Sequence, residues 1–254
     1  MASNDESDTI EDQLESIWQK WGQLDKHVWA PMISDMVIGL PPWPSYRKAY
    51  RTAHHGPFQL VATDGLTDKF DPDHPYLDPD YDDYDDLLKS HGFGCELFAL
   101  GEVQGEPVVP GHWMFELVAQ VATQLAHYGP WFAGRLHPSD PEDIEGVMSM
   151  DITATGSLAQ LSQKDFVHKS PIASPDCMYV TVLVMSRHQN VHNIPEHIIV
   201  EDDRQVGICC VQLLTNDESK EIYQNGHSGR GKIIKALKEQ NTLGISSLNR
   251  QSVG

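Results

Sequence analysis

The segment between residues 58 and 100 constrains the fold more than any other part of the chain. Two apolar runs, at residues 58–63 and 95–100, flank an acidic stretch and are bounded on their inner sides by glycine turns. The carboxylates between them are Asp71, Asp73, Asp78, Asp80, Asp82, Asp83, Asp85 and Asp86. An ionised carboxylate that leaves water without a partner costs several kcal/mol. The pattern therefore predicts two strands that hold a solvated acidic loop.

Aromatic residues alternate with these carboxylates, which favours recognition of a protein over catalysis. Aromatic side chains are typical anchors of protein interfaces. We therefore predict that this loop binds a partner. The predicted partner-binding residues are Phe70, Asp71, Asp73, Tyr76, Asp80, Tyr81, Asp82, Asp83, Tyr84, Asp85 and Asp86. A solvated loop without a partner is the simpler alternative.

The charge of the chain limits its partners. Its 254 residues include 37 Asp and Glu against 18 Lys and Arg, for a formal net charge of -19. Binding to nucleic acid through phosphates needs clustered cations, and an anionic membrane repels such a chain. We therefore expect no nucleic acid and no membrane as partners. A basic protein is the natural complement, although acidity also serves solubility alone.

The cysteines and the N-terminus indicate a reducing compartment. Cys95, Cys177, Cys209 and Cys210 form no C-x-x-C pair, and three of them lie in apolar runs, which predicts buried thiols. The first twelve residues lack the basic and apolar regions of a signal peptide. No apolar stretch approaches the roughly 20 residues that span a bilayer. We expect a cytoplasmic protein.

Capping signals and apolar spacing predict two helices in the first half of the chain. Asp8 is the expected N-cap of the first, with Glu11 completing a capping box. Apolar residues recur at helical spacing from there to Leu24. The second helix comprises residues 113–128 and ends at the Gly129–Pro130 pair.

Two further helices are predicted near the C-terminus. Thr215 and Glu218 form a capping box that opens a helix ending near Gly226. Residues 232–240 form a last, basic helix. The segment 241–254 has no apolar pattern, and we expect it to be a flexible tail.

Apolar, β-branched runs predict three more strands, at residues 147–153, 178–185 and 206–214. The run at residues 46–53 is ambiguous between strand and short helix. Helices and strands do not alternate regularly, so we predict a single α+β domain with a mixed, mostly antiparallel β-sheet flanked by α-helices. This domain covers residues 8–240 and follows a disordered N-terminus at residues 1–7.

Five short motifs are similar, in sequence and in order, to those of the Suppressor of fused domain family. They are P-P-W-P-S-Y-R-K-A-Y (41–50), D-G-L-T-D-K-F (64–70), G-F-G-C-E-L (92–97), W-M-F-E-L-V (113–118) and V-G-I-C-C-V-Q-L-L-T-N-D-E (206–218). The resemblance covers about residues 35–240. Phe70 stands where the animal members place an aromatic residue after the first glycine turn.

The resemblance implies a function without catalysis and without a cofactor. The single-domain form of the family is mostly bacterial and is commonly regarded as an immunity protein of polymorphic toxin systems. By this resemblance the chain would neutralise a basic toxin domain by occlusion. The longer animal members grip a short peptide that adds as a strand. Capture of an extended peptide motif by strand addition is therefore the alternative.

Other acidic residues near the loop have structural interpretations. Asp64 and Asp68 are expected to cap backbone N–H groups of the glycine turn rather than to act in catalysis. Glu96 begins a strand, and a buried carboxylate there needs a partner such as Arg47 or Arg51.

The acidic loop contains no complete calcium motif. Asp78, Asp80 and Asp82 alternate like the start of an EF-hand loop, but Asp83 replaces its glycine and Lys89 replaces its final glutamate. We therefore predict no EF-hand there.

No catalytic or metal-binding motif stands out elsewhere. His188, His192 and His197 share one polar stretch that Pro195 interrupts, and the chain has no H-E-x-x-H, G-x-S-x-G, Walker A or G-x-G-x-x-G sequence. We predict no metal site. An unrecognised hydrolase or metalloenzyme using the scattered histidines is the third alternative.

Overall fold

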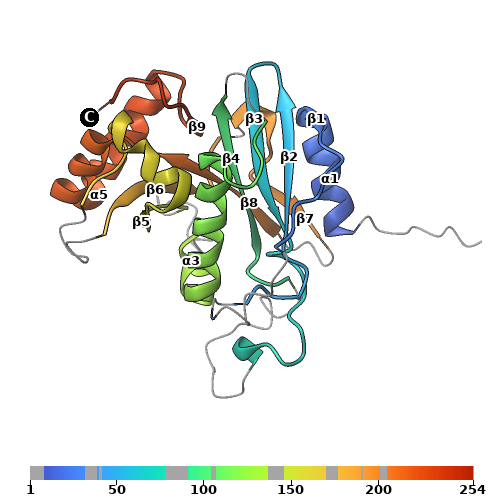
Figure 1. Cartoon of the computed structure of the whole chain (residues 1–254). Coiled ribbons are helices and arrows are strands. Elements are labelled where there is room, and N and C mark those ends of the chain that lie inside the picture. Colours follow the sequence, from blue (N-terminus) through green and yellow to red (C-terminus); the bar gives the residue numbers. More distant parts are fainter. Residues whose placement is uncertain are drawn as a thin grey trace, which may run out of the picture.

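A mixed β-sheet forms the centre of the computed structural model (Figure 1). The structure describes residues 9–31, 39, 42–77, 91–103, 107–136, 146–169, 177–189, 191–200 and 205–253. Within these residues the sheet has nine strands in the order β1-β2-β3-β4-β8-β6-β5, with β7 paired to β8 and β9 to β4. Their bounds are β1 Gln23–Leu24, β2 Ala49–His55, β3 Phe58–Asp64, β4 Cys95–Glu102, β5 Val147–Thr153, β6 Tyr179–Met185, β7 His197–Ile199, β8 Gln205–Leu213 and β9 Ile245–Ser246.

Most neighbouring strands of the sheet are antiparallel, and β4 is the exception. It runs parallel to both β8 and β9, while the remaining pairs are antiparallel. The predicted α+β class with a mixed, mostly antiparallel sheet is therefore confirmed.

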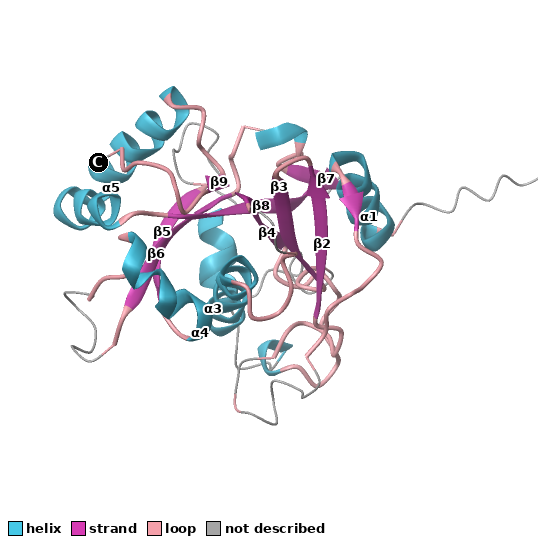
Figure 2. Ribbon diagram, turned by 45° about the horizontal axis from the view of Figure 1, so that its top comes forward, coloured by secondary structure: helices cyan, strands magenta, loops and turns pink. Residues whose placement is uncertain are grey.

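Helices cover both faces of the sheet (Figure 2). Their bounds are α1 Ile10–Trp21, α3 Trp113–Leu136, α4 Gly156–Ala159 and α5 Asn216–Glu239, with short 3-10 turns at η2 Pro75–Leu77, η3 Gln160–Lys164 and η4 Val191–Asn193. α3 and α4 lie on one face, whereas α1 and α5 lie on the other. Along β4, Leu97 packs toward α3 and Phe98 toward α1, as the alternation of side chains in a strand requires. Both side chains are fully buried.

The capping box of α1 begins one residue later than predicted. Thr9 is the N-cap, and its side chain accepts from the backbone N–H of Asp12 at 3.2 Å. The Asp12 carboxylate in turn accepts from the Thr9 backbone N–H at 3.2 Å. The sequence predicts Asp8 as the N-cap and Glu11 as its capping-box partner, one residue too early. Aspartate serves at N3 as glutamate does, so the spacing alone did not fix the register.

Glycines kink two helices at places where the sequence predicted stops. Gly129 in α3 has φ 43°, and helix resumes beyond it to Leu136. The capping box of Thr215 and Glu218 at the start of α5 is confirmed. Gly226 then takes φ 56° and ψ -128°, which are not helical, so α5 consists of two helical segments, as predicted. At both glycines the backbone leaves the helical conformation, and a second helical segment begins beyond it.

The C-terminal segment packs on the domain, although we expected it to be flexible. Its residues form β9, which pairs with β4. Arg250, which is nearly buried, forms a bidentate ion pair with Glu218 and donates to the Leu213 carbonyl at 3.0 Å. The backbone N–H of Val253 also donates to Glu218, at 3.2 Å. A two-residue strand and a single ion pair leave no periodic signal in the sequence.

Other expectations about the core are met. β2 begins inside the ambiguous run at residues 46–53 and ends two residues beyond it, so the strand alternative holds from Ala49 on. β5 has the bounds that its apolar run predicted. The Trp side chains at 18, 21, 43 and 113 belong to the core, and each is at most 9% exposed. Cys95, Cys209 and Cys210 are buried free thiols, and Cys177 is half-buried. Within the described ranges, no helix combines the length and apolar character needed to cross a membrane.

Candidate functional site

A tight turn at residues 64–68 is built around the buried carboxylate of Glu96. One carboxylate oxygen accepts from the backbone N–H groups of Gly65 and Thr67, each at 3.0 Å, and from the Thr67 hydroxyl at 2.8 Å. The other oxygen lies 2.5 Å from the Thr63 hydroxyl. Burial raises the pKa of Glu96 to about 7, although these hydrogen bonds lower it. The Glu96 carboxyl group therefore fixes the backbone of the turn by accepting its N–H groups.

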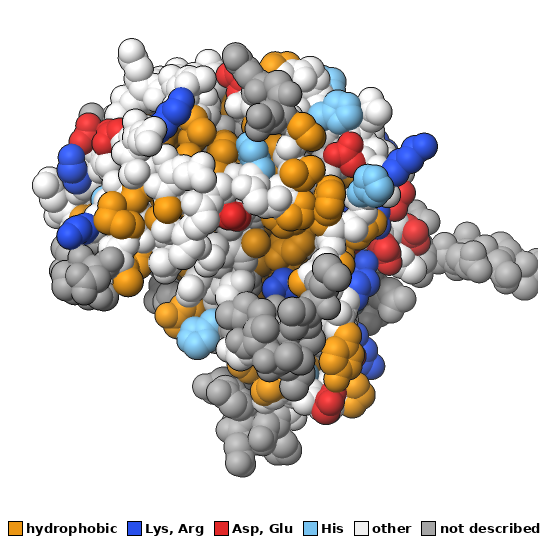
Figure 3. Space-filling view, in the orientation of Figure 1, with side chains coloured by type: hydrophobic (Ala, Val, Ile, Leu, Met, Phe, Trp, Pro, Cys, Tyr) orange, Lys and Arg blue, Asp and Glu red, His pale blue; other side chains and the backbone are white. Residues whose placement is uncertain are grey.

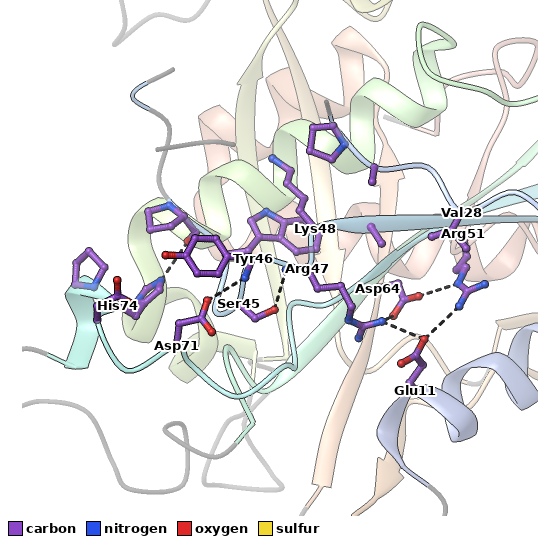
Figure 4. A pocket seen from close by; sticks show the side chains of 17 residues that line it. Glu11, Val28, Ser45, Tyr46, Arg47, Lys48, Arg51, Asp64, Asp71 and His74 are labelled. Atoms are coloured by element: carbon purple, nitrogen blue, oxygen red, sulfur yellow. Dashed lines mark hydrogen bonds and ion pairs between the residues drawn. The ribbon is translucent and has the colours of Figure 1, made fainter. Parts of the chain in front are cut away.

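Two arginines at the same turn pair with aspartates instead of with Glu96. Arg47 contacts Asp68 at 2.6 Å. Arg47 and Arg51 each contact Asp64 at 2.7 Å, as Figure 4 shows. The hydrogen bond with Asp68 raises the pKa of Arg47. The expected roles are thus exchanged: the glutamate caps the turn, and the aspartates bind the arginines. Contacts between distant residues decided this, and the sequence did not show them.

A cleft of about 580 Å³ opens beside this ion-pair network (Figure 4). Trp43 lines it, and the Lys48 ammonium lies 5.4 Å from the centre of that ring. Tyr46 is 73% exposed at the cleft, and its backbone N–H donates to Asp71 at 3.0 Å. Asp73 also lines the cleft and is exposed. Cationic, acidic and aromatic groups therefore surround one opening.

An apolar groove of about 360 Å³ adjoins the cleft between β2 and α3. Its lining includes Trp29, Tyr50 and Phe115, and the two hollows share Ala30, Pro31 and Lys48. Figure 3 shows hydrophobic side chains gathered in the middle of this face. We call the cleft and the groove together the β2–α3 face. It has the mixed apolar and charged character of a protein-binding surface.

The structure places the predicted partner-binding residues in different environments. Asp71 and Asp73 line the cleft. Phe70 is only 3% exposed, and its ring centre lies 5.5 Å from that of Phe93. The ring belongs to the core and is not exposed for docking, because the second glycine turn brings Phe93 against it. Tyr76 is half-buried, and its hydroxyl donates to the Ala126 carbonyl at 2.7 Å.

The remaining predicted residues lie outside the described residues. They are Asp80, Tyr81, Asp82, Asp83, Tyr84, Asp85 and Asp86, and the calcium pattern that starts at Asp78 lies there too. Their role stays a prediction.

The histidines considered as metal ligands lie in separate environments. His188 is buried, and its Nε2 lies 3.0 Å from the Ile208 carbonyl oxygen. Burial lowers the pKa of His188. The His192 ring packs at a tilt against Phe58, with ring centres 4.8 Å apart, and His197 is exposed on β7. In the part of the chain that the structure describes, no three His, Cys, Asp or Glu residues gather as a metal site.

No sequence pattern predicts the polar cluster that lies between β5, β6 and α5. The Thr181 hydroxyl donates to Asp151 at 2.8 Å and lies 2.8 Å from Nε2 of His168. The Tyr223 hydroxyl donates to the other Asp151 oxygen. These residues come from β5, β6, α5 and the segment before β6, so no sequence motif joins them. The cluster fixes the first half of α5 over the edge of the sheet.

Comparisons with family models, curated proteins and solved structures find no match for this chain. The likeness to the Suppressor of fused domain family therefore rests on the five motifs quoted above.

Proposed function

We propose that this chain is a non-enzymatic protein-binding domain that docks a basic partner on the β2–α3 face. The observation that carries the proposal is the cleft, where Asp71 and Asp73 lie beside exposed Tyr46 and next to an apolar groove. Aromatic and apolar groups beside the carboxylates of Asp71 and Asp73 suit a basic protein surface.

The ion pairs beneath the cleft support recognition over catalysis. Arg47 and Arg51 are held by Asp64 and Asp68 at 2.6–2.7 Å, and Glu96 accepts four hydrogen bonds. Carboxylates engaged in this way fix the shape of the cleft. A surface that is ordered before binding loses less conformational entropy when the partner docks.

Resemblance to the Suppressor of fused domain family supports a more specific role as a cytoplasmic immunity protein. The partner would then be a basic toxin domain whose active cleft is covered by this face. The net charge of -19 would speed capture of a basic domain, because opposite fields raise association rates by roughly 10- to 1000-fold at low salt.

The first prediction concerns charge at the rim of the cleft. Asp73→Lys should slow association with the basic partner by roughly threefold, because it reverses one charge at the docking face. Raising salt from about 0.1 M to about 1 M should reduce the difference, since the Debye length falls from about 10 Å to about 3 Å. The partner is first isolated by affinity purification, and association is then measured by surface plasmon resonance.

A matched variant separates local from global charge. Glu239→Lys makes the same charge change at the end of α5, where the side chain is 67% exposed. It should leave association nearly unchanged. If both variants slow association equally, net charge alone steers the partner and the β2–α3 face is not the docking site.

Capture of an extended peptide by strand addition remains the second candidate. Near the acidic segment the edge of the main sheet is β2, but residues 23–29 already pair with that strand. Tyr50 exchanges backbone hydrogen bonds with Trp29, the Thr52 carbonyl accepts from Asp25, and His54 pairs with Gln23. A peptide docked near this segment would therefore lie in the groove rather than extend the sheet there.

A further inference from the structure

β5 forms the end of the sheet farthest from β1 (Figure 1). Within the described residues its only strand partner is β6. Six of its seven residues are half-exposed, and only Ile152 is buried. Natural proteins usually protect such an edge with lysine, proline or a bulge. Residues 147–153 contain neither lysine nor proline.

The hydrogen bonds that flank β5 show which backbone groups point outward. Ser186 donates to the Gly146 carbonyl at 2.7 Å, and Ala154 donates to the Met178 carbonyl at 2.8 Å. In an antiparallel pair, alternate residues bond to the neighbouring strand. Even-numbered residues of this strand therefore bond to β6. The residues whose N–H and C=O groups do not bond to β6 are therefore Val147, Ser149, Asp151 and Thr153. The Thr153 carbonyl already accepts from the Thr155 N–H at 3.0 Å, so the outward groups that count are those of Val147, Ser149 and Asp151 and the Thr153 N–H.

We propose that this edge pairs with β5 of a second copy of the chain, antiparallel and about a twofold axis through Met150. With this axis, Ser149 of one copy lies opposite Asp151 of the other, and Val147 lies opposite Thr153. All of these are outward-facing residues, so the donors and acceptors of the two edges match. The two sheets then become one continuous sheet, and the pairing closes after two copies.

Side chains on the α5 face are complementary across this axis. Ser149 and Asp151 point toward α5, because Arg230 lies 3.5 Å from the Ser149 hydroxyl and Tyr223 donates to Asp151. Opposed residues in an antiparallel pair have Cα atoms about 5.5 Å apart. The pairing therefore brings Arg230 of each copy near Asp151 of the other. Because the axis is twofold, the contact between Arg230 and Asp151 of the other copy occurs twice in each dimer.

Apolar side chains match on the opposite face. Met148 and Met150 are half-buried at the border of the core beneath α3. The twofold axis places Met150 against Met150 of the second copy, and Met148 against Ile152. The pairing would remove both methionines from water, whereas a random strand would match neither these contacts nor the charges.

Ser149→Pro tests the pairing with little effect on the monomer. The Ser149 N–H points outward, so proline there removes a bond to the second copy and none to β6. Sedimentation velocity should show a concentration-dependent dimer for the wild type. The variant should raise the dimer dissociation constant by roughly 100-fold, because each dimer loses two backbone donors. Ser149→Ala, which keeps the N–H, should remain dimeric.

Hydrogen exchange gives a second measurement on the wild-type chain. The amides of Ser149 and Asp151 should be protected in the dimer and should exchange quickly on dilution. The proposal is overturned if the wild type stays monomeric, if Ser149→Pro dimerises as tightly as wild type, or if these amides are protected in the monomer. The last result would mean that another segment of the same chain covers the edge. None of these results bears on docking at the β2–α3 face.

Discussion

Two fully buried glutamates, Glu96 and Glu218, are stabilised in different ways. Glu218 forms a bidentate pair with Arg250 and also caps the first turn of α5. Glu96 accepts from backbone and hydroxyl donors, and no cation contacts it among the described residues. An ion pair therefore lies under α5, whereas a carboxyl group held by neutral donors lies under the glycine turn beside the cleft.

The largest loss of stability is expected when Glu218 loses its arginine partner. Arg250→Met should lower the free energy of unfolding by about 3–5 kcal/mol, because it leaves the Glu218 carboxylate buried and unpaired. Urea denaturation at neutral pH measures the change. Lys220→Met is the matched control, since it removes an exposed pair with Asp217 on the same helix. Water screens that exposed pair, so its loss should change stability far less than Arg250→Met does.

A double variant tests whether the buried charge of Glu218 causes the loss of stability in Arg250→Met. Combining Arg250→Met with Glu218→Gln should recover most of the lost stability, because no charge is then left buried. A single Arg250→Met variant that unfolds like the wild type would show that the C-terminal segment is not held by this pair.

The second effect concerns pH. The folded pKa of Glu96, about 7, lies above its ordinary value of 4.5, so the folded state binds the extra proton between these values. The contribution of Glu96 to stability is therefore greatest below about pH 4.5 and falls as pH rises to about 7, by on the order of 3 kcal/mol. Glu96→Gln should abolish this part of the pH dependence.

The geometry tolerates this substitution. The Thr63 hydroxyl lies 3.3 Å from the Leu97 carbonyl, so it can donate there while it accepts from a glutamine N–H or a protonated Glu96. The difference between the urea midpoints of wild type and Glu96→Gln is measured from pH 4.5 to 7.5. A constant difference over this range would mean that Glu96 stays ionised in the folded protein.

A smaller effect is expected from the backbone of the turn. Gly65 has φ 134°, and a Cβ atom there would lie 2.3 Å from the Arg47 carbonyl oxygen. Gly65→Ala should therefore cost about 2 kcal/mol of unfolding free energy. Gly231→Ala is the control, because its Cβ would meet open space within α5 and should stabilise the helix. Equal thermal stability of the two variants would contradict the strained turn.

Local patterns predicted the elements better than the site. The apolar runs that became β3, β5 and β8 are long enough to predict strands, and Thr215 with Glu218 predicted the start of α5. Local signals of this kind depend on neighbouring residues, which the sequence displays directly.

The partners of charged residues were harder to predict. Arg47 and Arg51 lie within reach of several carboxylates, and only the folded chain shows that Asp64 and Asp68 bind them while Glu96 does not. The inward position of Phe70 depends on Phe93, 23 positions further along the chain, and an aromatic residue beside carboxylates looks exposed from sequence alone.

Hydrogen exchange of the chain with and without its purified basic partner tests the central claim most directly. We predict that binding protects backbone amides around Tyr46 and Asp73, at the cleft, and leaves those of α5 unchanged. Protection confined to α5 or to β7, with exchange at the cleft unaltered, would contradict docking on the β2–α3 face.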